Sequence, residues 1–198
     1  MKGPITKEEA PQRARNGAHR TAITRNKVSA PTKFLIREAH VRDLDNKRVL
    51  DFGCGKGYDA DVYGFDKYDP AFFPTYPTGQ YDYIICNYVL NVLTIDDEAD
   101  ILEQIDELLK PDGVAYISVL RDRCETYGTL TIEGHFTKRG TYQRRVELPF
   151  QSLGKVSGGV KTYAMYKGDS KWVTQDQDTE TTRLGSSNQI PTEICQPN

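Results

Sequence analysis

Long apolar runs, clustered cysteines and clustered histidines are all missing from this sequence of 198 residues. No segment approaches the roughly 18 consecutive apolar residues that a membrane-spanning helix needs, and the charged start of the chain lacks the apolar stretch of a signal peptide. The four cysteines lie far apart, without a C-x-x-C pair, and there are only three histidines. This disfavours a disulfide scaffold and a structural metal site. We expect a single-domain cytoplasmic protein with no metal and no membrane contact.

The net charge of -2 is also small, but the charges are unevenly distributed. Residues 1–30 carry seven lysines and arginines against two glutamates, and residues 59–112 carry thirteen acidic residues against two lysines. Residues 121–145 are basic again, six against three. If the fold brings the two basic stretches together, they form a surface suited to a nucleic acid or a nucleotide-like substrate. Solvated surface charge is the alternative interpretation.

The pattern of apolar residues predicts one folded domain between two polar ends. Residues 1–28 lack a clear period, contain Pro4, Pro11 and Gly17, and predict a basic flexible arm. Residues 29–167 predict the domain. Residues 168–198 are rich in Thr, Gln, Asp and Ser and predict a disordered tail.

Within the domain, strands and helices are expected to alternate, which is typical of an α/β sheet. Ser29 and Pro31 begin a short amphipathic helix that reaches Val41. Apolar and β-branched runs predict strands at 49–52, 63–68, 81–86 and 114–120, and residues 96–109 predict the clearest helix. Residues 141–148 and 160–166 follow without a long helix between them. They predict an antiparallel strand pair that closes a mostly parallel sheet.

The motif that carries chemistry follows the first strand and reads Asp51-Phe52-Gly53-Cys54-Gly55-Lys56-Gly57. Alternate glycines permit positive φ and leave a backbone ledge against which a ligand can lie. In a dinucleotide site such a loop faces a pyrophosphate, which the Asp51 carboxylate would repel. A cofactor with an ammonium and a sulfonium group would instead be attracted, and that describes S-adenosylmethionine. A nicotinamide-dependent oxidoreductase stays as a further alternative.

This block resembles motif I of the class I S-adenosylmethionine-dependent methyltransferases, which have a Rossmann-like α/β sheet. The resemblance implies cofactor contacts from the glycine loop, from an acid after the second strand that holds the ribose hydroxyls, and from the end of the fourth family strand. Asp69 is the preferred ribose acid and Asp66 the alternative. The implied cofactor-binding residues are Asp51, Gly53, Cys54, Gly55, Gly57, Asp69 and Asn87.

A closer resemblance is to the methyltransferases associated with DNA phosphorothioation and their phage relatives. The residues behind it are 19–29 with Pro31, the triplet Tyr68-Asp69-Pro70, and the segment 139–143. This likeness covers the arm, the core and the segment after the fifth family strand.

Two departures from the family pattern stand out. Only six residues separate Gly57 from Gly64, so the helix after the glycine loop is expected to be reduced to a turn or lost. Between Pro70 and Tyr81 there is no clear third strand and no adenine-binding acid. Phe72, Phe73 or Tyr76 are open candidates for stacking on the base.

The acceptor is less defined than the cofactor. Asn87 and Tyr88 stand where DNA amino-methyltransferases have a polar residue, two prolines and an aromatic, but both prolines are absent. No catalytic residue is assigned; Asn87 and Asn91 are the candidates, with a turn role as the alternative for Asn91. We expect a methyltransferase acting on a nucleic acid or another anionic substrate. The alternatives are a small-molecule methyltransferase and a cofactor-binding accessory protein without activity.

Overall fold

The computed structural model describes residues 17–120, 129–130, 134–137, 140–156 and 159–171. Its helical elements are η1 (Ala18–Thr21), α2 (Ala30–Arg37), α3 (Tyr58–Tyr63), η2 (Leu90–Val92) and α4 (Ile95–Leu108). The strands are β1 (Val49–Phe52), β2 (Asp66–Tyr68), β3 (Tyr81–Asn87), β4 (Leu109–Leu120), β5 (Thr129–Leu130), β6 (His135–Phe136), β7 (Tyr142–Gln143), β8 (Gln151–Val156) and β9 (Val160–Tyr166).

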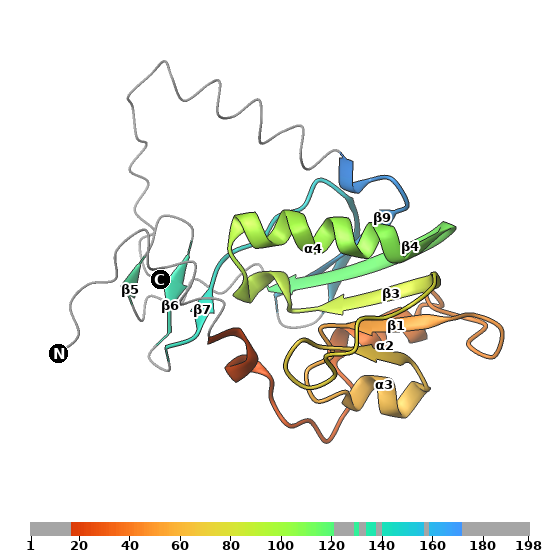
Figure 1. Cartoon of the computed structure of the whole chain (residues 1–198), viewed down its shortest axis with the longest axis horizontal. Coiled ribbons are helices and arrows are strands. Elements are labelled where there is room, and N and C mark those ends of the chain that lie inside the picture. Colours follow the sequence, from red (N-terminus) through yellow and green to blue (C-terminus); the bar gives the residue numbers. More distant parts are fainter. Residues whose placement is uncertain (1–16, 121–128, 131–133, 138–139, 157–158, 172–198) are drawn as a thin grey trace, which may run out of the picture.

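Six strands form the main sheet in the order β2-β1-β3-β4-β9-β8. The pairs β1–β2, β1–β3 and β3–β4 are parallel, whereas β9 runs antiparallel to both β4 and β8. This arrangement confirms the predicted Rossmann-like α/β sheet with its antiparallel strand near the C-terminal edge. β5, β6 and β7 form a separate small sheet beside the main one (Figure 1).

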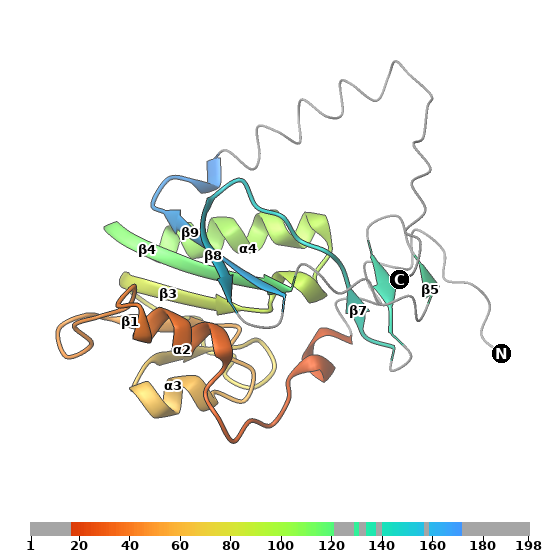
Figure 2. The same cartoon turned by 180° about the vertical axis from the view of Figure 1, so that it is seen from behind.

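Helices cover the main sheet on both faces, as both views show (Figures 1 and 2). On one face α4 buries Leu102, Ile105 and Leu108 against strand residues that include Leu50 and Ile84. On the other face Leu35 of α2 and Ala60 of α3 pack with residues of β1, β3 and β4. Burial of these apolar side chains, about 25 cal/mol per Å², stabilises the three layers.

Helix starts are well explained by local chemistry. Ser29 caps α2 by accepting a hydrogen bond from the Thr32 N–H, with Pro31 in the first turn, as expected. The helix ends at Arg37 rather than near Val41, because Ala39 adopts φ 56° and breaks the repeat. Thr94 caps α4 in the same way through the Asp97 N–H, and the acidic first turn suits the helix dipole.

Three predicted strands need correction. Tyr63 ends α3, so the second strand is only Asp66–Tyr68. β4 begins at Leu109, and residues 110–113 bulge out of its ladder with β3. The segment 141–148 does not pair with β9: β8 does, and only Tyr142–Gln143 of that segment forms a strand, in the small sheet. Val146 and Leu148, two residues apart, both pack into the core cluster that includes α4, but within the described residues they are not paired with a neighbouring strand.

The helix after the glycine loop is reduced, as expected, but not lost: α3 keeps six residues. In the described part of the chain no strand lies between residues 70 and 80, only a bridge from Asp69 to Phe73. None of the helices in that part is long and apolar enough to cross a membrane.

The predicted division into arm, domain and tail falls partly on residues 1–16 and 172–198, which lie outside the described residues. Residues 17–28 run against the glycine loop, as shown below. At the other end, the Gly168 N–H donates to the Asp106 carboxylate of α4, 2.6 Å away. The division itself stays a prediction.

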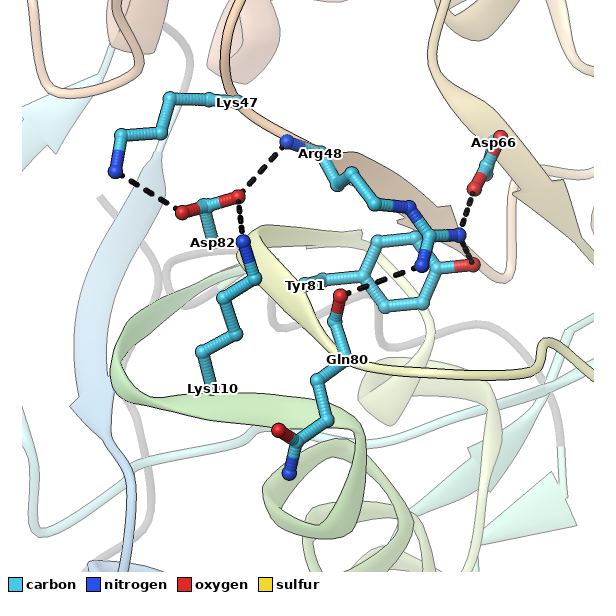
Figure 3. Close-up of polar contacts among 7 residues, drawn as sticks. All are labelled: Lys47, Arg48, Asp66, Gln80, Tyr81, Asp82 and Lys110. Atoms are coloured by element: carbon cyan, nitrogen blue, oxygen red, sulfur yellow. Dashed lines mark hydrogen bonds and ion pairs between the residues drawn. The ribbon is translucent and has the colours of Figure 1, made fainter.

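The amino-terminal edge of the parallel strands carries a dense polar cluster (Figure 3). Asp82, at the start of β3, accepts from Lys47 Nζ at 3.0 Å, Lys110 Nζ at 2.7 Å and the Arg48 N–H at 2.9 Å. Burial opposes its ionisation, but these donors prevail and lower the pKa of Asp82 to about 2. Arg48 also binds Asp66 and lies over the Tyr81 ring.

Candidate cofactor site

A cavity of about 510 Å³ opens at the carboxyl-terminal ends of β1, β2 and β3, the edge opposite the Asp82 cluster. Its walls come from the glycine loop, the residues after β2, the segment after β3, the start of α4 and the arm before α2. This volume lies within the range of small-ligand sites, and the carboxyl edge is where open α/β sheets bind ligands.

The glycine loop forms the floor of the cavity. Gly53, Gly55 and Gly57 all have positive φ, between 56° and 75°, as the alternating motif predicted. A Cβ atom at Gly53 would lie 2.3 Å from Val89 Cγ2, so that position accepts no side chain. The Gly53 and Cys54 N–H groups donate to the Tyr68 carbonyl, which fixes the loop against the end of β2.

Asp51 is the third residue of β1, just before this loop, and is only 5% exposed. Within the described residues its carboxylate receives no hydrogen bond. Burial, together with the nearby charge of Asp59, raises the pKa of Asp51 to about 8, although Arg25 opposes the shift. A cation arriving in the cavity would favour the ionised form, so the site is electrostatically prepared for a positively charged ligand.

Asp69 lies at the mouth of the same cavity, and its carboxylate already accepts three backbone hydrogen bonds. Oδ2 accepts from the Gly55 N–H at 2.9 Å, while Oδ1 accepts from the N–H groups of Ala71 and Phe72. Asp69 therefore braces the glycine loop, and about one lone-pair position remains for a ligand hydroxyl. Asp66 points elsewhere and pairs with Arg48, so it is not part of the cavity.

Asn87 lines the cavity from the end of β3 and joins a buried polar network. Its Nδ2 donates to Thr32 Oγ1 at 2.9 Å, and Thr32 in turn donates to Asp59 Oδ2 at 2.8 Å. The Ser29 N–H donates to Asp59 as well. Asn87 Oδ1 is buried and finds no partner among the described residues. The network ties α2, α3 and β3 together at the cavity. No motif in the sequence marked Asp59 as its centre.

The arm before α2 crosses the glycine loop. Lys56 donates to Thr24 Oγ1 at 2.7 Å, and the Tyr58 hydroxyl donates to the Asn26 carbonyl at 3.0 Å. Ala22 lies so near the loop that a Cβ at Gly55 would be 3.3 Å from its methyl group. His19 and Arg25 line the cavity from above, and the Arg25 guanidinium lies 5.9 Å from the centre of the Tyr88 ring.

Tyr88 follows β3 directly and adopts φ 65°, a conformation that costs a non-glycine residue free energy. Its N–H donates to the Ser118 carbonyl at 2.7 Å, which holds the strained turn. In this conformation Tyr88 lines the cavity. Burial raises the pKa of the Tyr88 phenol, so it stays protonated and can donate a hydrogen bond.

Asn91 is not brought to the cavity. Its Nδ2 donates to the Leu120 and Arg144 carbonyls and its Oδ1 accepts from the Leu120 N–H. These bonds saturate the amide, so the candidate catalytic role of Asn91 is wrong and its role is to brace η2 against β4. Cys54 does line the cavity, but burial and then Asp51 raise the pKa of its thiol to about 12. It is a wall residue and not a nucleophile.

The residues present fit S-adenosylmethionine. The backbone ledge, the buried Asp51 and the further carboxylates Asp59 and Asp69 suit a cation, and the same carboxylates would repel a pyrophosphate. A sheet with one antiparallel strand near its C-terminal edge, together with this loop, defines a class I S-adenosylmethionine-dependent methyltransferase.

Comparison with known proteins agrees. The chain belongs to the family described as the methyltransferase domain, whose model matches residues 24–153, about two-thirds of the sequence. The match includes the glycine loop and residues 24–28 of the arm described above, but not η1. No curated protein matches the chain.

Solved structures that are similar to this chain are distant from it in sequence. The 1,6-didemethyltoxoflavin-N1-methyltransferase of Burkholderia thailandensis, solved with its namesake ligand and S-adenosylhomocysteine, is 17% identical, with 84% of this chain and 93% of that chain covered and a TM-score of 0.50. A TehB-like methyltransferase from Corynebacterium glutamicum is 20% identical (81% and 97% covered, TM-score 0.42). PKMT2 from Rickettsia typhi is also 20% identical (TM-score 0.36), with 48% of this chain and only 26% of that chain covered.

Proposed function

We propose that this methyltransferase acts on a small acceptor held beneath the arm, between η1 and the segment after β3. The observation that carries this proposal is the path of residues 18–25 across the cavity. Because the arm is hydrogen-bonded to the glycine loop, it covers part of the cavity and leaves less room for a polymer.

The residues around this space favour a compact, partly apolar acceptor. Val92 and Ala18 supply apolar surface, Thr21 and Tyr88 supply hydroxyl groups, and His19 supplies an imidazole. The hydrogen bond to the Ser118 carbonyl holds Tyr88 in its strained backbone conformation, so the position of Tyr88 is fixed before a ligand arrives.

The chemistry needs alignment more than a strong acid or base. When bound, S-adenosylmethionine supplies a methyl group on a sulfonium leaving group. The glycine loop, Asp51 and Asp69 would hold this cofactor beside the acceptor. This chain orients the acceptor through Tyr88 and the arm, and Asp51 holds positive charge at the cavity floor. A proton released by the acceptor passes to water or to His19.

The name of the Burkholderia enzyme describes methylation of a small heterocycle, which shows that a domain of this fold and length can serve such an acceptor. The two chains align over most of their lengths, which supports a small acceptor for this chain as well.

The test follows a labelled methyl group from S-adenosylmethionine into cell extract separated into low-molecular-mass, nucleic-acid and protein fractions. We expect label in the low-molecular-mass fraction. Gly55→Val fills the ledge and should abolish transfer, whereas Gly64→Asn, at a positive-φ glycine with open space around it, should retain it. Label confined to nucleic acid would contradict the proposal. No turnover, with the cofactor bound, would favour the accessory-protein alternative.

A second candidate is a nucleic-acid acceptor, favoured by one specific observation. The two stretches come close at one place: a Cβ on Gly17 would lie 3.4 Å from the Gly140 carbonyl, and one on Gly140 would lie 3.9 Å from Arg20. The resemblance to phosphorothioation-associated and phage proteins points the same way. Here the test is binding of duplex DNA at several salt concentrations with Arg20→Ala and Arg25→Ala, which should both lower affinity and reduce its salt dependence.

A further inference from the structure

One wall of the cofactor cavity is a stripe of helix α4. Asp97, Asp100, Ile101 and Gln104 all line the cavity, and their spacing of three, four and seven residues places them on one helix face. Pro70 and Ala71, which follow Asp69 directly, line the same cavity. The expected stacking aromatics are not there: Phe72, Phe73 and Tyr76 do not line the cavity.

The loop that replaces a third strand runs beside this helix. The Tyr76 ring meets Tyr68 edge to face with centroids 5.3 Å apart. Burial and then the Glu107 carboxylate raise the pKa of Tyr76. Tyr68, Leu93 and Ile101 pack against the same core cluster. The cavity next to Asp69 is therefore lined both by the start of this loop, at Pro70 and Ala71, and by α4, at Ile101 and Gln104.

Gln104 is the neutral polar group in that wall. It is half-buried, and no described residue hydrogen-bonds its amide. The edge of adenine presents an N–H donor beside a ring-nitrogen acceptor, and a glutamine amide presents the matching acceptor and donor. Asp100, one turn earlier, offers acceptors only and is exposed.

We propose that Gln104 binds the adenine edge of the cofactor, while Pro70, Ala71 and Ile101 contact the faces of the base. The proposal rests on S-adenosylmethionine occupying this cavity with its ribose at Asp69. It assigns adenine recognition to α4, in a chain that forms no strand between residues 70 and 80 to provide it.

The test measures binding by calorimetry, without turnover. S-adenosylhomocysteine is compared with its 6-deamino analogue, in which purine replaces adenine, for the wild type, Gln104→Met, Asp100→Ala and Glu103→Met. Glu103 lies next to Gln104 in sequence but is exposed and outside the cavity, so it is the matched control. We expect the wild type to bind S-adenosylhomocysteine roughly ten-fold more tightly than the analogue, because the analogue lacks the exocyclic N–H that Gln104 would bind. Gln104→Met should show no preference, and both other variants should keep it.

Retained preference in Gln104→Met would overturn the proposal, and so would its loss in Asp100→Ala. Gln104→Glu keeps the acceptor for the exocyclic N–H, the only group by which the two compounds differ, so its preference should be kept while the lost donor weakens binding of both compounds. That variant guards against misfolding of Gln104→Met, and thermal unfolding checks both. If the wild type binds neither compound, the cofactor site itself is refuted; if it binds and only the Gln104 dependence fails, this inference alone falls.

Discussion

Two aspartates are buried at opposite ends of the parallel strands, and the protein surrounds them differently. Asp82 is 7% exposed and Asp51 is 5% exposed. Asp82 has two lysines and a backbone N–H on its carboxylate (Figure 3), and its pKa falls to about 2. Asp51 has no donor within the described residues and faces Asp59 and Asp69, and its pKa rises to about 8.

The two side chains are similarly inaccessible to water, but Asp51 lies much deeper in the protein and no described residue donates to it. Burial therefore dominates its shift, whereas three donors outweigh burial at Asp82. The amino-terminal edge uses its carboxylate to stabilise the fold. The carboxyl-terminal edge keeps a carboxylate whose charge is unfavourable until a cation binds, which is typical of a functional site that lowers stability.

The largest effect is expected from breaking the stable end. Asp82→Ala leaves Lys47, Lys110 and the Arg48 N–H without their common acceptor and should lower the free energy of unfolding by about 3 kcal/mol. Urea denaturation measures this change. Binding of S-adenosylhomocysteine should stay within about two-fold, because the cluster lies at the opposite edge of the sheet. Asp112→Ala, an exposed acid in the β4 bulge, is the control; a loss below about 1 kcal/mol for Asp82→Ala would contradict the assigned role.

The opposite sign is expected at the other end. Asp51→Asn removes a carboxylate that burial disfavours, and should raise the free energy of unfolding at pH 8 by about 2 kcal/mol, after the cost of burying the amide. The same change removes negative charge from the cavity floor and should weaken S-adenosylmethionine binding by roughly ten-fold or more. Thermal unfolding and calorimetry on one preparation test both parts. A variant that loses stability would show that Asp51 supports the fold as Asp82 does.

Sequence reasoning succeeded where the determinants are local. Positive φ at Gly53, Gly55 and Gly57 follows from the alternation itself, and the Ser29 cap is a short-range hydrogen bond. The apolar period of α4 likewise predicted both the helix and its buried face.

Prediction failed where distant parts of the chain supply the partners. Asn91 looked like a site residue because it follows a strand, yet its amide is satisfied by Leu120 and Arg144, far along the chain. Val146 alternates as in a strand but packs in the core under α4. The α4 stripe ending at Gln104 was not anticipated, because a polar helix face is normally exposed to water.

The pH dependence of stability sharpens the comparison of the two aspartates. Asp82 has a lowered folded pKa, so its contribution is present above about pH 4 and is lost as the pH falls toward 2. Asp51 has a raised folded pKa, so stability declines as the pH rises from about 4 to about 8. The slope from one proton is at most about 1.4 kcal/mol per pH unit. The stability difference between Asp51→Asn and the wild type should therefore grow between pH 4 and 8 and be constant above that; a flat difference would contradict the shift.

The smallest effect is expected from Arg48→Lys, at the exposed side of the stable edge. The guanidinium binds Asp66 and the Tyr81 hydroxyl through one nitrogen and the Gln80 carbonyl through another, and it lies 4.4 Å from the Tyr81 ring centre. Lysine keeps the charge but not the planar fork. Because the Arg48 and Asp66 side chains are about half exposed, solvent screens the pair, and the loss should be only about 0.5 kcal/mol in urea denaturation. A loss as large as that of Asp82→Ala would mean that the surface pair, and not the buried carboxylate, holds this end of the sheet together.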